Sequence, residues 1–486
     1  MPILPRDNHV ALRLLLTVAI LRLLLNKITS ELARSGDAAA RLLRLRGYSP
    51  VIVASETEPC GDAWVRDACE VRTGALDEVL ETVRTSFSPL SLCYVSPGLS
   101  LTHPGVEAAR RAGIPLLGEL SLGGAFFRGR VTAVTGSKGK SSVVKFLADA
   151  LCLAGRTAKP CGNYGTPFCA IAAEAEPPED AIVECSSFQA ETATRLFRPD
   201  AAVLLNLSKD HLNRHGTMEA YRAAKVRLFS FLPPGGLALV PAPCEDAWAL
   251  SEQVRALRSD LDLQTFGGAS SGADWRYGNG ILTAPDGKRI SICGSYFDNA
   301  ILGPAAAAAY AVLVRRGLSS PQIEQAFRIF EPLPHRMQRI AERDGIAWID
   351  NSKATNLESL LASVRMAPKP VLLLAGGRLK EPLSLSGRVL LESGVQKVYT
   401  YGEASEAMAS GWSADLPTAR CSTLKEALMA CEKDIRKENV HSPASVLLAP
   451  GTASFDQFRS YAERGDVFAV LVRELLTGTK NLPFDR

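Results

Sequence analysis

The chain has 486 residues, enough for roughly two to four domains. Its apolar content of 47% and charged content of 22% are ordinary for a globular protein, and a net charge of +4 without a block of Lys or Arg gives no indication of nucleic-acid binding. Eleven cysteines without a C-x-x-C pair argue against a zinc ribbon or a disulfide framework, so we expect reduced thiols and a cytoplasmic location.

An apolar run near the start of the sequence, VALRLLLTVAILRLLL, occupies residues 10–25. It contains Arg13 and Arg22 and is shorter than the about 20 apolar residues that a membrane-spanning helix needs. Because no small-residue cleavage site follows closely, we expect neither a membrane span nor a signal peptide. We interpret the run as a buried or amphipathic helix, or as an atypical N-terminal extension.

Three regions follow one another, with predicted boundaries near residues 122 and 333. In the first, residues 1–122, short apolar runs alternate with helical stretches, which is typical of a parallel α/β sheet. The alternation restarts with VTAVTG in residues 123–333, and Pro332 and Pro334 mark the next break. Residues 334–486 repeat the pattern, so we predict an α/β protein with three domains.

A phosphate-binding loop is predicted in the stretch VTAVTGSKGKSSVVKF. Residues 131–135 are apolar or β-branched, as in a buried parallel strand, and Gly136 and Gly139 permit a backbone with positive φ. A helix starting at Ser141 would present free N–H groups to an anion, and Lys140 would add a positive charge.

This loop is not a Walker A loop, because Val134 occupies the position of the first glycine, six residues before Lys140. The alternative is a surface turn rich in Gly, Ser and Lys. The strand before the loop and the helix after it, with Val144, Leu147 and Leu151 on one face, favour the phosphate site.

Polar side chains follow the next apolar runs at regular places. Glu184 ends AIVE, Asp210 and His211 follow AAVLLNLS, and Lys225 lies in the helical stretch YRAAKVRLF. Ligands of open α/β sheets bind at the carboxyl ends of strands. Each residue alone is ordinarily exposed to solvent, but the ordered set indicates a magnesium-nucleotide site.

At this point the chain resembles the Mur ligases of peptidoglycan synthesis. The matching segments run in family order from about residue 90 to 470 and include TGSKGKSS, CGNYGTPF, VECSSFQAET, LPHRMQRI, WIDNSKATN and VLLAPGTASFDQF. The resemblance implies a Rossmann-like UDP-binding domain, a central ATP-binding domain with a P-loop ATPase-like parallel sheet, and a Rossmann-like glutamate-binding domain.

The implied activity is ATP-dependent addition of D-glutamate to UDP-N-acetylmuramoyl-L-alanine through an acyl phosphate. A variant that adds L-glutamate is the closest alternative. Folylpolyglutamate synthase is a further alternative, although SSFQ and SKATN argue against it, and a nucleotide-binding scaffold without activity is the non-enzymatic one. We expect a monomer with small-molecule substrates and no nucleic-acid or membrane partner.

The resemblance also implies ATP, two Mg²⁺ ions and a carboxylated Lys225, since carboxylation turns a cationic side chain into the oxygen ligand that Mg²⁺ prefers. Ser141 and Glu184 would serve the first ion, His211 the second, and the implied catalytic residues are Lys140, Lys225, His335 and Arg336. The implied ATP-binding residues are Gly136, Ser137, Lys138, Gly139, Lys140, Ser141, Ser142, Asn299, Arg336 and Asp350.

The substrate-binding residues follow from the same resemblance. A Lys and hydroxyl groups suit glutamate because it brings two carboxylates. The implied UDP-substrate residues are Ser96, Gly98 and Asn163, and the implied glutamate residues are Lys353, Thr355, Lys380, Ser454 and Tyr461.

Several positions depart from the family pattern. Lys138 replaces the commoner Asn, Leu302 replaces an Asn that often helps to hold adenine, and Tyr461 replaces the usual Phe. Asp350 and Asn351 stand in reversed order.

The largest departure is N-terminal. The strand expected before ARSGDAAARLL is missing there, and NKITSEL stands in its place. Ser35 and Gly36 are interpreted as survivors of the glycine-rich turn, and UDP recognition is expected to depend more on residues 96–98 and Asn163.

Overall fold

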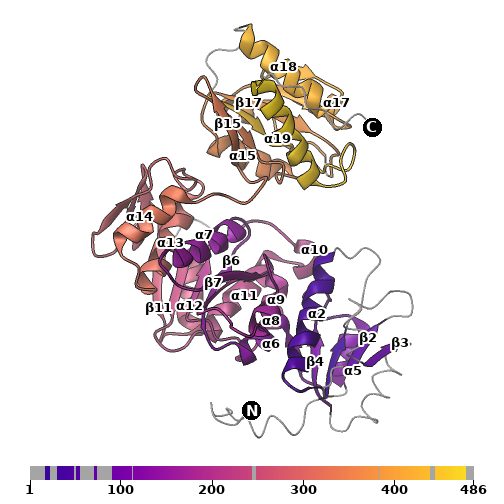
Figure 1. The fold of residues 1–486 in the computed structure, drawn as a ribbon, viewed down its shortest axis with the longest axis vertical. Helices are drawn as coiled ribbons and strands as arrows, with labels where there is room; N and C mark the ends of the chain where they lie inside the picture. Colours follow the sequence, from indigo (N-terminus) through magenta and orange to yellow (C-terminus); the bar gives the residue numbers. More distant parts are fainter. Residues whose placement is uncertain are drawn as a thin grey trace. The chain divides into compact units, whose positions relative to one another are not determined.

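The computed structural model describes residues 17–21, 30–48, 51–54, 70–73, 90–111, 113–242, 248–380, 382–437 and 444–477 (Figure 1). Within these residues the strands form a five-stranded, a nine-stranded and a six-stranded sheet, which confirms the predicted α/β class. The chain divides into two compact units, one of residues 1–298 and 302–330 and the other of residues 299–301 and 331–486.

The N-terminal sheet is parallel, and its strand order is β3-β2-β1-β4-β5. Its strands are β1 Thr17–Leu21, β2 Val51–Ala54, β3 Glu70–Thr73, β4 Leu90–Val95 and β5 Leu116–Gly118. The helix predicted for the early apolar run is therefore wrong for β1, which is the central strand. A parallel strand enclosed on both faces is apolar throughout, so periodicity does not distinguish it from a buried helix.

The strand that seemed to be missing is thus present, upstream of the place where it was expected. Helix α2, Ser30–Leu45, then contains Ser35 and Gly36, so these residues are helical and the interpretation as a turn is wrong. Among the residues described, no helix is long and apolar enough to cross a membrane.

Helix α2 joins the N-terminal sheet to the central one. The other helices here are α5 Pro104–Arg111 and α6 Glu119–Phe126, and the facing helix is α8 Phe168–Ala172. Ala39 and Leu42 of α2 are buried, and the guanidinium of Arg46 donates to the carbonyl oxygen of Ala172 at 3.0 Å. Both sheets therefore belong to one compact unit.

The central sheet has the order β14-β13-β12-β11-β10-β9-β6-β8-β7. Its strands are β6 Arg130–Thr135, β7 Ala158–Gly162, β8 Asp180–Glu184, β9 Ala201–Leu204, β10 Leu237–Pro241, β11 Asp262–Gly268, β12 Trp275–Gly278, β13 Ile281–Thr283 and β14 Arg289–Ser291. β6 is paired in parallel with β8 on one side and β9 on the other. Successive strands β8 and β9 thus lie on opposite edges of β6. Open α/β sheets bind ligands at such a switch point in the strand order.

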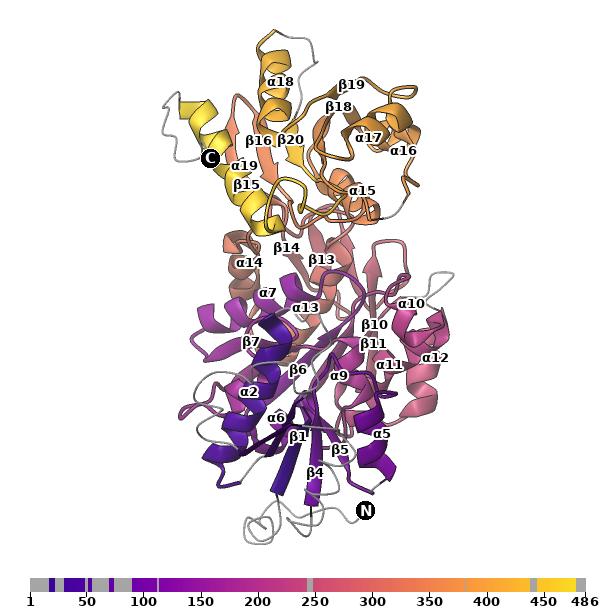
Figure 2. The same cartoon turned by 90° about the vertical axis from the view of Figure 1, so that its right-hand side faces the viewer.

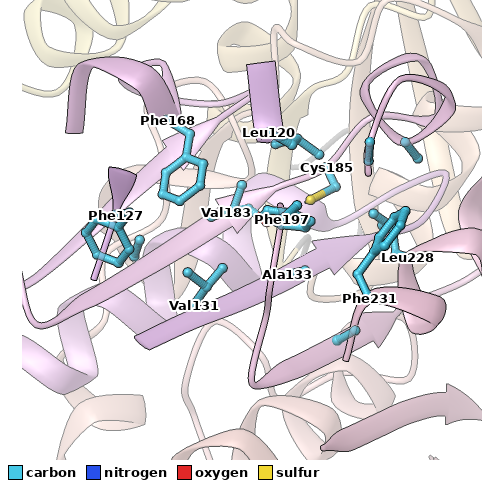
Figure 3. Packing of buried hydrophobic residues seen from close by; sticks show 14 of the residues in the cluster. Leu120, Phe127, Val131, Ala133, Phe168, Val183, Cys185, Phe197, Leu228 and Phe231 are labelled. Atoms are coloured by element: carbon cyan, nitrogen blue, oxygen red, sulfur yellow. The ribbon is translucent and has the colours of Figure 1, made fainter. Parts of the chain in front are cut away.

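Helices cover both faces of the central sheet. Besides α6 and α8, the helices of this part of the chain are α7 Lys140–Leu153, α9 Ser187–Glu191, α10 Leu212–His215, α11 Met218–Val226, η1 Arg227–Phe231, α12 Trp248–Leu257, α13 Gly303–Arg315 and α14 Ser320–Ile329. On one face, Val131 and Val183 from the strands meet the rings of Phe127 and Phe168, whose centroids are 5.4 Å apart (Figure 3). On the other, Phe146 of α7 stacks on Phe327 of α14 at 4.2 Å.

The second unit contains the sheet β15-β16-β20-β17-β18-β19. Its strands are β15 Gln338–Arg343, β16 Ile346–Asp350, β17 Val371–Gly376, β18 Val395–Tyr401, β19 Thr418–Arg420 and β20 Ser445–Leu448. Its helices are α15 Leu357–Met366, α16 Gly387–Glu392, α17 Ser405–Trp412, α18 Leu424–Arg436 and α19 Tyr461–Thr477. α15, α16 and α17 pack on one face of the sheet and α18 and α19 on the other (Figure 2). β16, β20 and β17 are parallel neighbours, so their carboxyl ends meet at one edge.

Candidate active site

The predicted phosphate loop connects β6 to α7. Gly136 has φ 148° and Gly139 has φ 80°, backbone angles that favour glycine. Gly139 is the N-cap of α7, and no side chain accepts a capping hydrogen bond there. The N-terminus of a helix favours a bound anion. The ammonium of Lys140 donates to the carbonyl oxygens of Gly136 at 2.8 Å and Ser137 at 3.1 Å, so the predicted phosphate-binding charge lies over its own loop.

Asn206, which was not predicted as a site residue, lies two residues beyond the neighbouring strand β9 and holds this loop. Its Oδ1 accepts from the backbone N–H groups of Ser137 at 3.1 Å and Lys138 at 2.8 Å, and its Nδ2 donates to the carbonyl oxygen of Lys138 at 3.0 Å. The hydroxyl of Tyr221 lies 3.1 Å from that of Ser137. Its position just past an apolar strand is the sequence feature from which Asn206 could have been predicted as a site residue.

Glu184 ends β8, as predicted, with 2% of its surface exposed. Its Oε1 accepts from Asn163 Nδ2 at 2.7 Å, whereas its buried Oε2 has no hydrogen-bond partner among the residues described. A buried carboxylate oxygen without a partner fits a hard divalent cation. Asn163, predicted to contact the UDP-substrate, here orients this carboxylate.

Lys225 of α11 is buried, with 1% of its surface exposed, although a single Lys on a helix is usually solvated. Its Nζ donates to the carbonyl oxygen of Gly136 at 2.9 Å and lies 4.6 Å from the ring centroid of Tyr221. Burial is the main cause that lowers the pKa of Lys225 to about 7, and the positive charge of Lys140 is the second cause. Near pH 7, a large fraction of the protein molecules then carries Lys225 as a neutral amine, which is the form that can take up CO₂.

His211 is the N-cap of α10, with φ 52°. Its ring lies 4.9 Å from that of Phe188, and its Nε2 is 3.7 Å from a carboxylate oxygen of Asp210. Partial burial lowers the pKa of His211, which favours the neutral imidazole that a metal requires. No three His, Cys, Asp or Glu of the described residues form a metal-holding group, but Mg²⁺ commonly takes one or two protein ligands beside phosphate and water.

Arg214, in the same short helix, connects this region to the predicted UDP-substrate loop. Its Nη2 donates to the carbonyl oxygen of Leu99 at 3.1 Å and to Glu191 at 2.8 Å, and its guanidinium lies 4.2 Å from the ring centroid of Phe188. Leu99 directly follows the loop that carries Ser96 and Gly98. The segment with His211 and the loop after β4 are thus tied together within the first unit.

In the second unit, His335 and Asp350 form a buried pair. His335 has φ 60°, and its Nδ1 lies 2.7 Å from Asp350 Oδ2. Asp350 is fully buried, and its Oδ1 accepts from the N–H of Ser352 at 2.8 Å. The hydrogen bond to Asp350 raises the pKa of His335. Both oxygens of Asp350 thus have partners within the chain, and its predicted contact with ATP stays a prediction.

The predicted glutamate residues lie at or after the strand ends of the second unit. Lys353 follows β16, and its ammonium lies 3.8 Å from the ring centroid of Tyr461, the first residue of α19. Ser454 is buried after β20, Lys380 is exposed after β17, and Thr355 is half-buried.

Two predicted ATP residues also belong to the second unit. Asn299 accepts from the N–H of Ile301 at 3.1 Å. Arg336 is half-buried beside His335 in the chain.

Residues 134–302 match a family model described as the Mur ligase middle domain. The chain is 32% identical over 455 residues to the UDP-N-acetylmuramoylalanine--D-glutamate ligase of Koribacter versatilis, covering 91% of this chain and 96% of that relative. Identity to the ligase of the same name from Anaeromyxobacter dehalogenans is 34% over 461 residues, covering 91% of this chain and 96% of that relative. The chain belongs to the Mur ligase family.

Solved Mur ligases have the same fold. The MurF ligase from Thermotoga maritima in complex with ADP aligns with 78% of this chain and 92% of its own, with a TM-score of 0.53 and 19% sequence identity. In the present chain, the region matched by the family model contains the phosphate loop, Glu184, His211 and Lys225.

Proposed function

We propose that this Mur ligase adds D-glutamate to UDP-N-acetylmuramoyl-L-alanine, with ATP activating the alanyl carboxylate as an acyl phosphate. The observation that carries the proposal is identity of 32% and 34%, over 91% of the chain, to ligases named for D-glutamate addition. The phosphate loop at the switch point of the central sheet supports the use of ATP.

The first unit supplies groups for phosphate and metal. The N–H groups at the start of α7 and the ammonium of Lys140 bind and orient the β- and γ-phosphates, where they stabilise negative charge that develops during transfer. Mg²⁺ held by Ser141 and Glu184, with carboxylated Lys225 and His211 for the second ion, would neutralise phosphate oxygens. The unpartnered Oε2 of Glu184 and the buried amine of Lys225 support this assignment.

The second unit supplies groups for the amino acid. Lys353, Lys380 and the hydroxyls of Thr355, Ser454 and Tyr461 are our assignment for the two carboxylates of glutamate. We assign Arg336 and His335 to the γ-phosphate. The three domains are proposed to be residues 1–122 for the UDP-substrate, 123–333 for ATP and 334–486 for glutamate, in a cytoplasmic monomer.

The test is phosphate release by the purified enzyme with ATP, Mg²⁺, UDP-N-acetylmuramoyl-L-alanine and either glutamate enantiomer. We expect release with D-glutamate only, and none when the nucleotide-sugar substrate is omitted. Release with L-glutamate only would refute the stereochemistry, and glutamate addition to a folate would favour folylpolyglutamate synthase.

Lys140→Ala probes the phosphate loop in the same assay. Removing a charged group that stabilises a transition state costs at least about 100-fold in rate. Lys145→Ala is the matched control, because Lys145 lies in the same helix but outside the phosphate loop, where it pairs with Asp149 and lies 4.8 Å from the ring centroid of Phe330. Equal activity of the two variants would contradict the role of Lys140.

A further inference from the structure

Arg464 of α19 is a fully buried arginine in the second unit. Its Nε donates to Ser352 Oγ at 2.9 Å, and its Nη2 donates to the carbonyl oxygens of Ser352 at 2.9 Å and Thr452 at 3.2 Å. Its Nη1 lies 3.5 Å from the carbonyl oxygen of Gly376. A buried charge is costly unless its donors are used, so these bonds define one position for the guanidinium.

The acceptors come from three neighbouring strand ends. Ser352 follows β16, Thr452 follows β20 and Gly376 is the last residue of β17. The hydroxyl of Thr452 also donates to the carbonyl oxygen of Gly376, which ties two of the segments to each other. The predicted glutamate residues Lys353 and Ser454 lie one and two residues beyond the segments that Arg464 holds.

Ser352 extends the network to the start of α19. Its hydroxyl accepts from Arg464 and donates to the carbonyl oxygen of Tyr461 at 2.7 Å. Tyr461 and Lys353 are thereby held opposite each other, with the ammonium 3.8 Å from the ring centroid.

The next residue, Gly465, leaves room for the ring of the buried His335 because it has no side chain. A Cβ atom at this position would lie 2.0 Å from His335 Nδ1 and 2.7 Å from Asp350 Oδ2. The pair of Arg464 and Gly465 therefore sets the distance of α19 from both the loop network and His335.

We propose that Arg464 is a positioning residue for the amino-acid pocket, holding the segments that carry Lys353, Ser454 and Tyr461 in one arrangement. Its buried positive charge also favours binding of an amino acid with two carboxylates. This inference rests on the proposed assignment of the glutamate residues. It predicts an effect on the amino acid that is separate from any effect on ATP.

The test compares Arg464→Lys, which keeps the charge but loses the planar fork of donors, with Arg473→Lys at an exposed position of the same helix. For Arg464→Lys we expect the KM for D-glutamate to rise about tenfold or more, and the KM values for ATP and the nucleotide-sugar to stay within about twofold. Arg473→Lys should match the wild type. Equal rises in all three KM values, or no rise, would overturn the proposal.

If circular dichroism shows that Arg464→Lys does not fold, Ser352→Ala replaces it in the kinetic test. It removes the hydroxyl between Arg464 and Tyr461 and should give the same selective rise in the KM for D-glutamate. Unchanged kinetics of this variant would also refute the proposal.

A second measurement needs no substrate. Backbone hydrogen exchange at residues 352–355 and 452–454 should become faster in Arg464→Lys and not in Arg473→Lys, and unchanged exchange would count against the positioning role. If the wild type proves to use L-glutamate, the proposed stereochemistry fails, whereas the KM comparison is made with L-glutamate and still decides the role of Arg464.

Discussion

The side-chain nitrogen of Lys225 lies 2.9 Å from the carbonyl oxygen of Gly136, the residue at which β6 passes into the phosphate loop. Folding thus brings a helical lysine directly to the loop that is proposed to bind ATP. Because burial lowers its pKa to about 7, this lysine can act as a nucleophile toward CO₂ at neutral pH.

Carboxylation of Lys225 is the first prediction. Wild-type enzyme equilibrated with ¹³C-bicarbonate should show a carbamate carbon signal in ¹³C NMR, and Lys225→Ala should lack it. The signal should weaken as the pH falls below about 7, because protonation removes the neutral amine. An identical spectrum of wild type and variant would contradict carboxylation. Lys209→Ala, which changes an exposed lysine, should retain the signal.

Asn206→Ala should weaken ATP binding, because the phosphate loop loses three hydrogen bonds to this side chain. At about 1 kcal/mol for each bond, the three bonds contribute about 3 kcal/mol, so we expect the KM for ATP to rise by up to about 100-fold. The KM for glutamate, measured in the same preparation, is the internal control and should change little. A variant with an unchanged KM for ATP would show that the loop keeps its shape without Asn206.

Asp350→Asn should change how stability depends on pH. The raised pKa of His335 means that its protonated form is favoured in the folded state. This stabilisation is fully present below the unfolded-state pKa of about 6.5 and is lost as the pH rises through the raised folded-state value.

The difference in unfolding free energy between wild type and Asp350→Asn should therefore shrink as the pH rises above about 6.5, as measured by urea titration. In NMR titrations the midpoint of His335 should fall in the variant. A difference in stability that does not depend on pH would argue against the ion pair.

Phe146→Ala should destabilise the first unit. Phe146 of α7 is buried against α14, where it stacks on Phe327, so truncation leaves a cavity. Loss of a buried Phe costs about 3–5 kcal/mol, which denaturant unfolding can measure. Leu153→Ala removes an exposed side chain at the end of the same helix and should cost much less. Similar losses in both variants would mean that the aromatic cluster contributes little.

Local patterns in the sequence determined the elements that carry the phosphate site. The apolar run before Gly136 and the helical spacing of Val144, Leu147 and Leu151 predicted β6 and α7, and all three helix residues are buried. Such periodicities depend on neighbouring residues, so they can be read without knowing the fold. The apolar run that contains β1 has no such periodicity, and only its place in the middle of the sheet made it a strand.

The environment of each site residue depended on the tertiary structure. Asn206 meets Lys138 across 68 residues, Lys225 meets Gly136 across 89, and Arg464 meets Ser352 across 112. The sequence determined which chemical groups this Mur ligase has, and the resemblance of its motifs to the family predicted which of them serve ATP, metal and substrate. Burial and hydrogen-bond partners arise from the packing of segments that are distant in the sequence. The lowered pKa of Lys225 and the hydrogen bonds of Arg464 to three strand ends could therefore be found only in the folded chain.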